Sequence, residues 1–274
     1  MPDAGACVNA SRPGCSATRN SEVRHLFGPG GLRVLAAFVR DDPLLAFDFD
    51  GTLAPIVSHP DRARVSKPVA RELERLSLAL PVAVISGRRV ADVLPRLGFV
   101  PRFVVGNHGA EDPGDPASAH WPSRLDDLRE RLARAAQRLT GAGVWVEDKG
   151  HSLALHFRQA PDAAVATDRI NEVLVDLDPS LRCFGGKLVV NVVCAEAPDK
   201  ADSLAALMAR ADAHSALFVG DDVNDEVVFA RHHRHWLCVR VGRDDPQSQA
   251  DFFLDRSSEM RALLARIRQL RVPA

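Results

Sequence analysis

The sequence predicts an α/β protein whose core is an open parallel sheet with helices on both faces and whose middle is an inserted α+β segment. Short apolar runs of strand length alternate with amphipathic helical patterns along most of the chain. Most of these runs end in polar residues, as expected where parallel strands deliver side chains to one edge of a sheet. Over residues 113–194 the order changes to helix, two strands, helix, two strands, which predicts a separate antiparallel sheet.

Continuous apolar runs indicate the strands of the parallel sheet, because such strands are buried on both faces. Apolar residues at helical spacing predict helices over 69–80 and 202–211 between them. The predicted strands lie at 44–51, 82–88, 103–109, 216–222, 235–242 and 251–255.

The turn-rich stretch 112–123 leads into the insert. Alternating polar and apolar residues within the insert predict a sheet with helices on its apolar face and an open polar face. The predicted elements are a helix over 124–139, strands over 144–148 and 152–158, a helix over 162–177, and strands over 181–184 and 187–193 joined by Gly185 and Gly186.

We therefore expect three parts of the chain. Residues 1–24 are rich in Gly, Pro, Ser and Asn, which predicts a disordered lead-in. Residues 25–112 and 195–274 form the parallel core domain, and residues 113–194 form a cap domain whose polar face could close over the strand ends of the core.

Composition excludes several classes of protein. The net charge is −1, so nothing suggests an extended nucleic-acid surface. No apolar run approaches the roughly 18–20 residues of a membrane span, and the N-terminus lacks the apolar segment of a secretory signal. The five cysteines are scattered without metal-site spacing, so we expect reduced thiols and a cytoplasmic location.

The first strand ends in Asp48-Phe49-Asp50-Gly51-Thr52, and strand alternation would point both aspartates to the same side. Like charges that close repel each other, and a magnesium ion bound by hard oxygen ligands would relieve the repulsion. An ordinary strand-to-turn cap is the alternative. The run 220–226 adds four acids, which is more than the dipole of one helix N-terminus accounts for.

Two further motifs suit an anion. Ser86 and Gly87 follow the second strand, where a hydroxyl and free N–H groups at a helix start can bind phosphate. Lys200 precedes the helix 202–211 and could balance phosphate charge. Each of these residues taken alone is as compatible with a turn or a surface position.

The four motifs follow one another along the chain as DFDGT (48–52), SGR (86–88), Lys200 and GDDVNDE (220–226), each at a strand end or helix start. In this order they resemble the haloacid-dehalogenase superfamily of phosphotransferases over about residues 25–270. The αββαββ insert resembles that superfamily's larger cap class on a Rossmann-like core. The resemblance implies that Asp48 is the nucleophile that forms an aspartyl-phosphate and that Asp50 is the general acid and base. It also implies Mg²⁺ held by Asp48, the Asp50 carbonyl and Asp221, with Asp225 binding directly or through water. The phosphoryl group is implied to be bound by Thr52, Ser86, Gly87 and Lys200.

Closer detail resembles trehalose-6-phosphate phosphatases, in DFDGTLAPI, ISGR, GNHGAE, GDDVNDE, the late GRDDPQSQADFFL and the cap stretch VEDKGHSLALHFR. This implies hydrolysis of trehalose 6-phosphate to trehalose and phosphate, and it is compatible with a functional association with a trehalose-phosphate synthase. The residues implied to lie near the sugar are Arg88, Asn107, His108, Glu111, Glu147, Lys149, His156, Arg158, Lys187 and Asn191.

Asn191 departs from the family pattern, which usually has an acidic residue four positions after the cap lysine. The departure leaves open a related sugar phosphatase, for example one acting on mannosyl- or glucosyl-3-phosphoglycerate. A non-catalytic regulatory domain is the third interpretation. The intact Asp48, Asp50, Lys200 and Asp221 argue against it, because such a domain would be expected to have lost an acid of the core.

Overall fold

The computed structural model describes residues 24–231, 233–243 and 245–271. The described residues fall into two compact units. The smaller unit comprises residues 113–197, and the larger unit comprises the described residues before 113 and after 197. The disordered lead-in predicted for residues 1–24 lies, apart from residue 24, outside the described residues.

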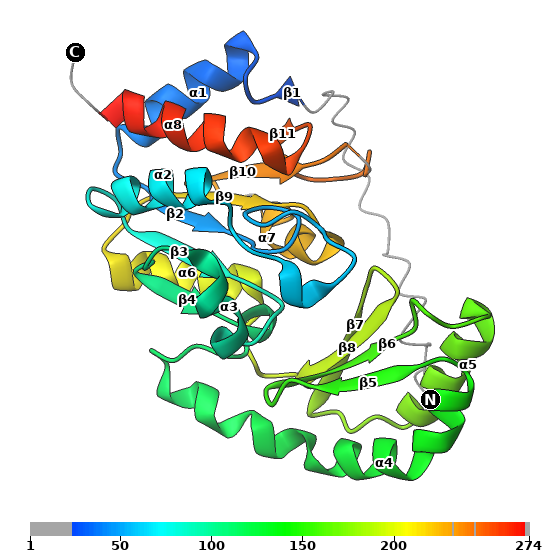
Figure 1. Cartoon of the computed structure of the whole chain (residues 1–274). Helices are drawn as coiled ribbons and strands as arrows, with labels where there is room; N and C mark the ends of the chain where they lie inside the picture. The colour runs from blue at the N-terminus through cyan, green and yellow to red at the C-terminus, as the bar shows by residue number, and fades with distance from the viewer. Residues whose placement is uncertain (1–23, 232, 244, 272–274) are drawn as a thin grey trace. The chain divides into compact units, whose positions relative to one another are not determined.

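The larger unit is built on a seven-stranded sheet in which every pairing is parallel (Figure 1). The strand order is β1 (Arg24–His25), β11 (Phe252–Leu254), β10 (Trp236–Val241), β9 (Ala216–Gly220), β2 (Leu44–Phe47), β3 (Val82–Ile85), β4 (Phe103–Val105). The order reverses between β2 and β9, because β3 and β4 follow β2 to one side and β10 and β11 follow β9 to the other. Ligands bind at such a reversal in sheets of this kind.

Helices cover both faces of this sheet because alternate residues of each buried strand point to opposite sides. Leu45 and Phe47 of β2 pack in one core cluster, and Leu44 and Ala46 pack in another. The first cluster is completed by α1 (Pro29–Val39), α2 (Lys67–Ser77), α3 (Val90–Leu97) and α8 (Met260–Arg271), and the second by α6 (Lys200–Ala211) and α7 (Glu226–Phe229). The predicted doubly covered parallel sheet is confirmed.

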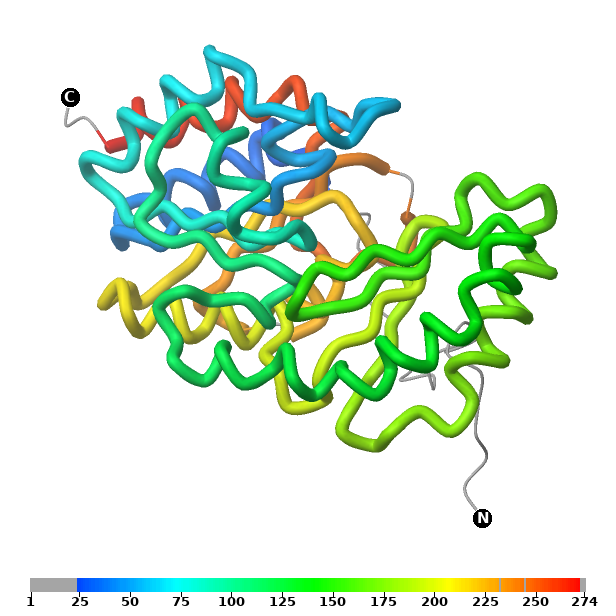
Figure 2. Tube along the Cα trace, turned by 60° about the horizontal axis from the view of Figure 1, so that its bottom comes forward, coloured from blue at the N-terminus to red at the C-terminus, as the bar shows by residue number. Residues whose placement is uncertain are grey.

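The smaller unit is a four-stranded antiparallel sheet with two helices packed on one face, traced in green to yellow-green in Figure 2. Its core joins apolar residues of both helices with Leu153, Leu155, Val190 and Val192 of the sheet. The elements in chain order are α4 (Asp126–Gly141), β5 (Trp145–Asp148), β6 (Ser152–His156), α5 (Ala163–Leu174), β7 (Leu181–Gly186) and β8 (Val189–Cys194). This is the predicted αββαββ order.

Three local expectations are wrong, two about the insert and one about the reduced state of the cysteines. The hairpin between β7 and β8 turns at Lys187 and Leu188 rather than at the two glycines, which continue β7. Strand β6 ends at His156, so Arg158 lies in the following turn instead of on the strand. Cys183 is disulfide-bonded, whereas Cys194 and Cys238 are free and buried.

No helix among the described residues has both the length and the apolar character needed to cross a bilayer. The last helix instead packs on the larger unit beside α2, and an ion pair ties the two together. The carboxylate of Glu72 accepts from Arg268 of α8 at 2.8 Å and from Arg75 of its own helix at 3.1 Å. Glu72 is buried, and its hydrogen bond from Arg268 lowers its pKa below the usual 4.5.

We expect Arg268→Ala to lower the free energy of unfolding by about 1–2 kcal/mol, because the buried Glu72 carboxylate loses its cross-helix partner. Arg75→Ala removes a more exposed pair within one helix and is expected to cost less than about 0.5 kcal/mol. Urea unfolding of the two variants and the wild type measures both losses.

The stabilisation that the Glu72–Arg268 pair gives to the fold should also decrease as the pH falls. Because the pKa of Glu72 is lowered by folding, its contribution is complete above the usual 4.5 and is lost as the pH falls through the lower folded value. The difference in unfolding free energy between the wild type and Arg268→Ala should therefore become smaller as the pH is lowered. Equal losses for the two arginine variants, or a gap that widens in acid, would contradict this account.

Candidate active site

Two neighbouring strands of the larger unit end in the acids that the sequence motifs contain. Asp48 follows β2, and its N–H donates to Val219 of β9 at 2.8 Å, so the pairing of these strands continues to the site. Asp221 follows β9 directly. The parallel pairing of β2 and β9 therefore brings the first and last motifs together across more than half of the chain.

Three buried carboxylates and one ammonium form the centre of this site. Carboxylate oxygens of Asp48, Asp221 and Asp225 all lie within 4.8 Å of one another. The Lys200 ammonium, also buried, donates to Asp48 Oδ1 at 2.8 Å and to Asp225 Oδ1 at 2.7 Å. One positive charge is thus set against three negative charges, which leaves a net negative, oxygen-lined site suited to a hard divalent cation.

Both oxygens of Asp225 have hydrogen bonds within the protein. Oδ1 accepts from Lys200, and Oδ2 accepts from the N–H groups of Asp221 and Asp222 at 2.9 and 3.0 Å. These bonds fix the loop after β9 and the position of the ammonium. Asp48 and Asp221 are consequently the better candidates for direct metal ligands, and Asp225 holds them in place.

The charges of this group shift the pKa values of its members. Burial raises the pKa of Asp48 well above its usual value, and the negative charges of Asp225 and Asp221 add to the rise while Lys200 opposes it. Burial alone would lower the pKa of Lys200, but the charges of Asp225 and Asp48 outweigh it and raise the pKa. The ammonium therefore stays charged, and a carboxylate as poorly solvated as Asp48 favours a bound cation.

Of the residues predicted to bind phosphate, Lys200 and Thr52 contact this centre, and Ser86 and Gly87 follow the neighbouring strand β3. Thr52 is fully buried, and its hydroxyl donates to Asp221 Oδ1 at 3.3 Å. Ser86 is fully buried after β3, where its hydroxyl accepts from the N–H of Arg88 at 3.1 Å. Gly87 leaves room for the ring of His108, because a Cβ there would lie 2.4 Å from the ring.

Asp50 does not share the environment of Asp48, contrary to the expectation from strand alternation. Strand β2 ends at Phe47, so Asp50 lies in the turn, and its side chain is 44% exposed. Its carboxylate pairs with Arg88 instead of joining the buried group. Arg88, predicted near the sugar, is therefore held at the acid of the first motif.

The motif after β4 holds the loop 86–90 in place. The Asn107 side-chain amide donates to Glu111 Oε2 at 2.7 Å, and the N–H of Val90 donates to the same oxygen at 3.0 Å. The N–H groups of Asn107 and His108 donate to the carbonyls of Arg88 and Ser86. Asn107 is fully buried, so in this structure it and Glu111 brace the loop 86–90.

The remaining residues predicted near the sugar belong to the smaller unit. Glu147 and His156, on the paired strands β5 and β6, are joined by a 2.9 Å contact, and Lys149 lies 3.8 Å from Glu147. Trp145, which the sequence analysis did not select, stacks on His156 at 5.0 Å. Arg158 and Lys187 are exposed in turns, whereas Asn191 of β8 is buried.

Sequence reasoning also missed two supports of the site. Asp92 accepts from Arg88 at 2.8 Å, and its position two residues into α3 gave no signal because acids are common there. Glu226 of the GDDVNDE run forms a buried pair with Arg240 at 3.0 Å. It therefore ties the loop after β9 to β10 rather than adding a charge to the centre.

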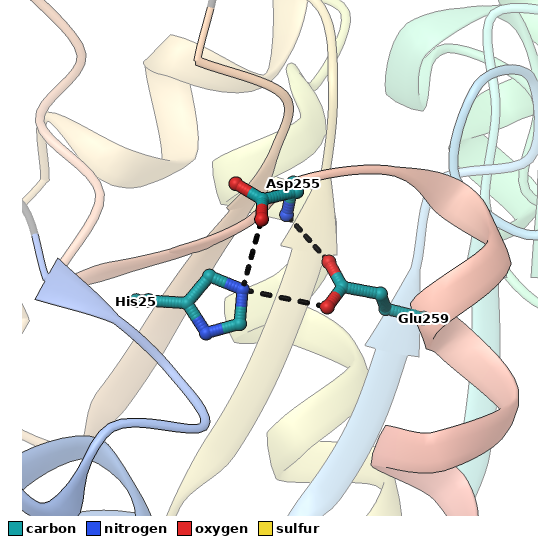
Figure 3. Close-up of side chains that lie close together, drawn as sticks. All are labelled: His25, Asp255 and Glu259. Carbon is teal, nitrogen blue, oxygen red and sulfur yellow. Dashed lines mark hydrogen bonds and ion pairs between the residues drawn. The ribbon is translucent and has the colours of Figure 1, made fainter.

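A second group of metal-ligating residue types lies at the edge of the sheet, between β1 and the residues just before α8 (Figure 3). His25 Nε2 is 3.7 Å from an oxygen of Asp255 and 3.4 Å from one of Glu259. However, the N–H of Phe27 donates to His25 Nδ1 at 3.2 Å. A neutral ring that accepts at Nδ1 carries its hydrogen on Nε2, so the lone pair needed for a metal is absent.

Comparison with known proteins places this arrangement in a family. The family model described as trehalose-phosphatase matches residues 46–258. The protein named "Probable trehalose-phosphate phosphatase" from Sinorhizobium fredii is 30% identical over 240 residues, covering 85% of this chain and 90% of that protein. A trehalose-phosphate phosphatase from Mycolicibacterium paratuberculosis is 35% identical over 202 residues, covering 68% of this chain but only 50% of that protein.

Among solved structures, the C-terminal domain of the Candida albicans trehalose-6-phosphate phosphatase has the same fold, with a TM-score of 0.70. The match covers 92% of this chain and 99% of that domain at 20% identity. The resemblance drawn from the motifs is therefore confirmed at the level of family and fold.

Gly51→Ala should disrupt the acidic centre. Gly51 has a φ of +78°, and a methyl carbon there would lie 2.0 Å from Asp221 Oδ2, so both the backbone and the carboxylate must move. We expect a loss of about 2–4 kcal/mol of unfolding free energy, together with loss of activity. In Gly30→Ala, where the nearest atom is 3.8 Å away, the same substitution falls in helix α1 and should be neutral or stabilising. Similar unfolding curves for the two variants would show that the approach to Asp221 is not tight.

Proposed function

The chain belongs to the trehalose-phosphatase family, and we propose that it is a magnesium-dependent phosphatase that hydrolyses trehalose 6-phosphate through an aspartyl-phosphate. The observation that carries the proposal is the buried group of Asp48, Asp221 and Asp225 around Lys200 at the ends of β2 and β9. Asp225 fixes the loop after β9, but three buried acids around one lysine leave a net negative charge that is costly to bury. Such a group suits a site that receives a cation and a phosphoryl group.

The donor set fits Mg²⁺, because carboxylate oxygens are hard ligands and the group carries excess negative charge. Asp48 and Asp221 would hold the ion, together with the backbone carbonyl of Asp50. When bound, the ion neutralises charge on the phosphoryl oxygens and on the attacking carboxylate.

The reaction then follows from the chain's own groups. An oxygen of Asp48 bonds to phosphorus while the bond from phosphorus to the sugar oxygen breaks, and Asp50 gives that oxygen a proton. Lys200, Ser86 and Thr52 hold the phosphoryl oxygens. Water then attacks phosphorus, the bond from phosphorus to the Asp48 oxygen breaks and regenerates the Asp48 carboxylate, and Asp50 takes a proton from the water.

The smaller unit supplies candidates for sugar recognition. Glu147, Lys149 and His156 gather polar groups of both signs on one stretch of β5 and β6, and sugar hydroxyls can both donate to and accept from such groups. Asn191 stands where the family usually has an acid, and its amide can still accept and donate. We therefore keep trehalose 6-phosphate ahead of a glycosyl-phosphoglycerate as the proposed substrate.

The direct test is a hydrolysis screen over sugar phosphates with Mg²⁺ present. The wild type should release phosphate from trehalose 6-phosphate, and Asp48→Asn should reduce release by at least about a hundredfold while the fold is kept, because an amide cannot accept the phosphoryl group. Activity of Asp48→Asn above a few per cent would remove Asp48 from the role of nucleophile. Faster turnover of another glycosyl phosphate would make that compound the substrate and would leave the proposed mechanism unchanged.

Metal binding can be tested without turnover. At about a hundredfold excess over its dissociation constant, Mg²⁺ should stabilise the wild type by about 2.7 kcal/mol against thermal unfolding. Asp221→Asn should lose this gain, yet be no less stable than the wild type in the absence of metal, because it removes one of three like charges. Asp255→Asn, in the second acidic group, should retain the gain. Equal gains in all three proteins would place the metal elsewhere.

A further inference from the structure

Arg88 holds the carboxylate of Asp50 with a two-pronged contact. Its Nε donates to Asp50 Oδ2 at 2.6 Å, and its Nη2 donates to Asp50 Oδ1 at 2.8 Å. The planar guanidinium matches the plane of a carboxylate in this arrangement, so the pair fixes direction as well as distance. The bonds to Asp50 and Asp92 raise the pKa of Arg88 despite its burial, so the guanidinium remains charged.

The guanidinium is itself held from other sides. Nη1 donates to Asp92 Oδ2 at 2.8 Å, Nη2 also donates to the carbonyl of Pro60 at 3.0 Å, and the group lies 5.4 Å from the centre of the Phe49 ring. The other oxygen of Asp92 accepts from Arg96. The Arg88 side chain is only 14% exposed. The guanidinium is therefore held in one position, and its two hydrogen bonds orient the partly exposed Asp50 carboxylate.

This contact leaves Asp50 able to accept a proton. A carboxylate oxygen has two lone pairs, and Arg88 uses one on each oxygen of Asp50. The remaining lone pairs can receive a hydrogen from water in a direction set by the guanidinium. The second half-reaction needs this direction with every substrate, because the attacking water must always give up a proton, whereas a leaving group that is stable as an anion needs none.

We propose that Arg88 is a positioning residue for the second half-reaction, in which it aims the Asp50 carboxylate at the water that cleaves the aspartyl-phosphate. The inference rests on the proposed function. In this step the water oxygen bonds to phosphorus, the bond from phosphorus to Asp48 breaks with its electron pair going to the Asp48 carboxylate, and the water proton passes to Asp50. Arg88 touches neither the water nor the phosphorus.

The test separates the two half-reactions with para-nitrophenyl phosphate, whose leaving group needs no proton. Arg88→Lys keeps the positive charge but cannot make the two parallel hydrogen bonds to Asp50. With Mg²⁺ present, it should form the aspartyl-phosphate at nearly the wild-type rate and then hydrolyse it about tenfold or more slowly. Stopped-flow absorbance should show a burst of nitrophenol near one per site. Acid quench with radiolabelled substrate should trap more phosphate on the variant than on the wild type.

Two further variants sharpen the result. Asp92→Asn leaves Arg88 in place but weakens its anchor, so it should show the same accumulation to a smaller extent, and it carries the test if Arg88→Lys does not fold. Arg64→Lys is the matched control, because Arg64 is an exposed arginine that contacts the carbonyl of Pro95 and not Asp50. It should behave as the wild type.

Each other outcome overturns the inference in a recognisable way. A raised KM for the sugar phosphate without accumulation would make Arg88 a substrate contact. Slower formation of the aspartyl-phosphate would place Arg88 in the first half-reaction. Unchanged kinetics would make the ion pair structural. Failure of the proposed function is distinct, because the wild type would then turn over no phosphate ester, or would do so with no labelled protein in any variant.

Discussion

The site depends on one buried contact, in which the Lys200 ammonium lies between Asp48 and Asp225. Taking a charged group out of water costs several kcal/mol, so neither the lysine nor the acids would be stable there alone. Helix capping gives the ammonium its place. Asp199 caps α6 by accepting from Ala201 and Asp202, and this makes Lys200 the first residue of the helix. The sheet supplies the other side, because β2 and β9 end at the same edge.

Glycine determines how closely the acids can gather. A Cβ at Gly51 would lie on the carboxylate of Asp221, and a Cβ at Gly220 would lie 2.3 Å from the Asp225 carboxyl carbon. Each glycine belongs to the motif at one strand end, and each makes room for a different acid after β9, Gly51 for Asp221 and Gly220 for Asp225. The repeated pairing of Asp with Gly in these motifs is thus a packing requirement, in addition to the turn that the φ of +78° at Gly51 provides.

The fold was largely predictable because buried parallel strands are apolar along their whole length, so their positions in the chain and their polar ends can be read from such runs. The two-residue strand β1, Arg24–His25, contains no apolar run and was missed. Contacts between residues distant in sequence were not predictable. The sequence placed Arg88 near the sugar and gave no sign that it bonds across 38 residues to Asp50. Nor did it show that Asn107 and Glu111, placed there too, brace the loop 86–90. Polar residues in loops have several plausible partners, and only the packed chain selects among them.

Asp48 and Asp50 show why two acids separated by one residue can have different chemistry. Strand alternation would give them one environment, but β2 ends at Phe47 and the chain turns. Asp48 remains buried beside Lys200, which is the environment that the proposed nucleophile requires. Asp50 lies partly in solvent beside Arg88, where protons can be exchanged with water. A separate cation for each carboxylate relieves their repulsion, and it gives the two acids the different environments that the proposed roles of nucleophile and proton carrier require.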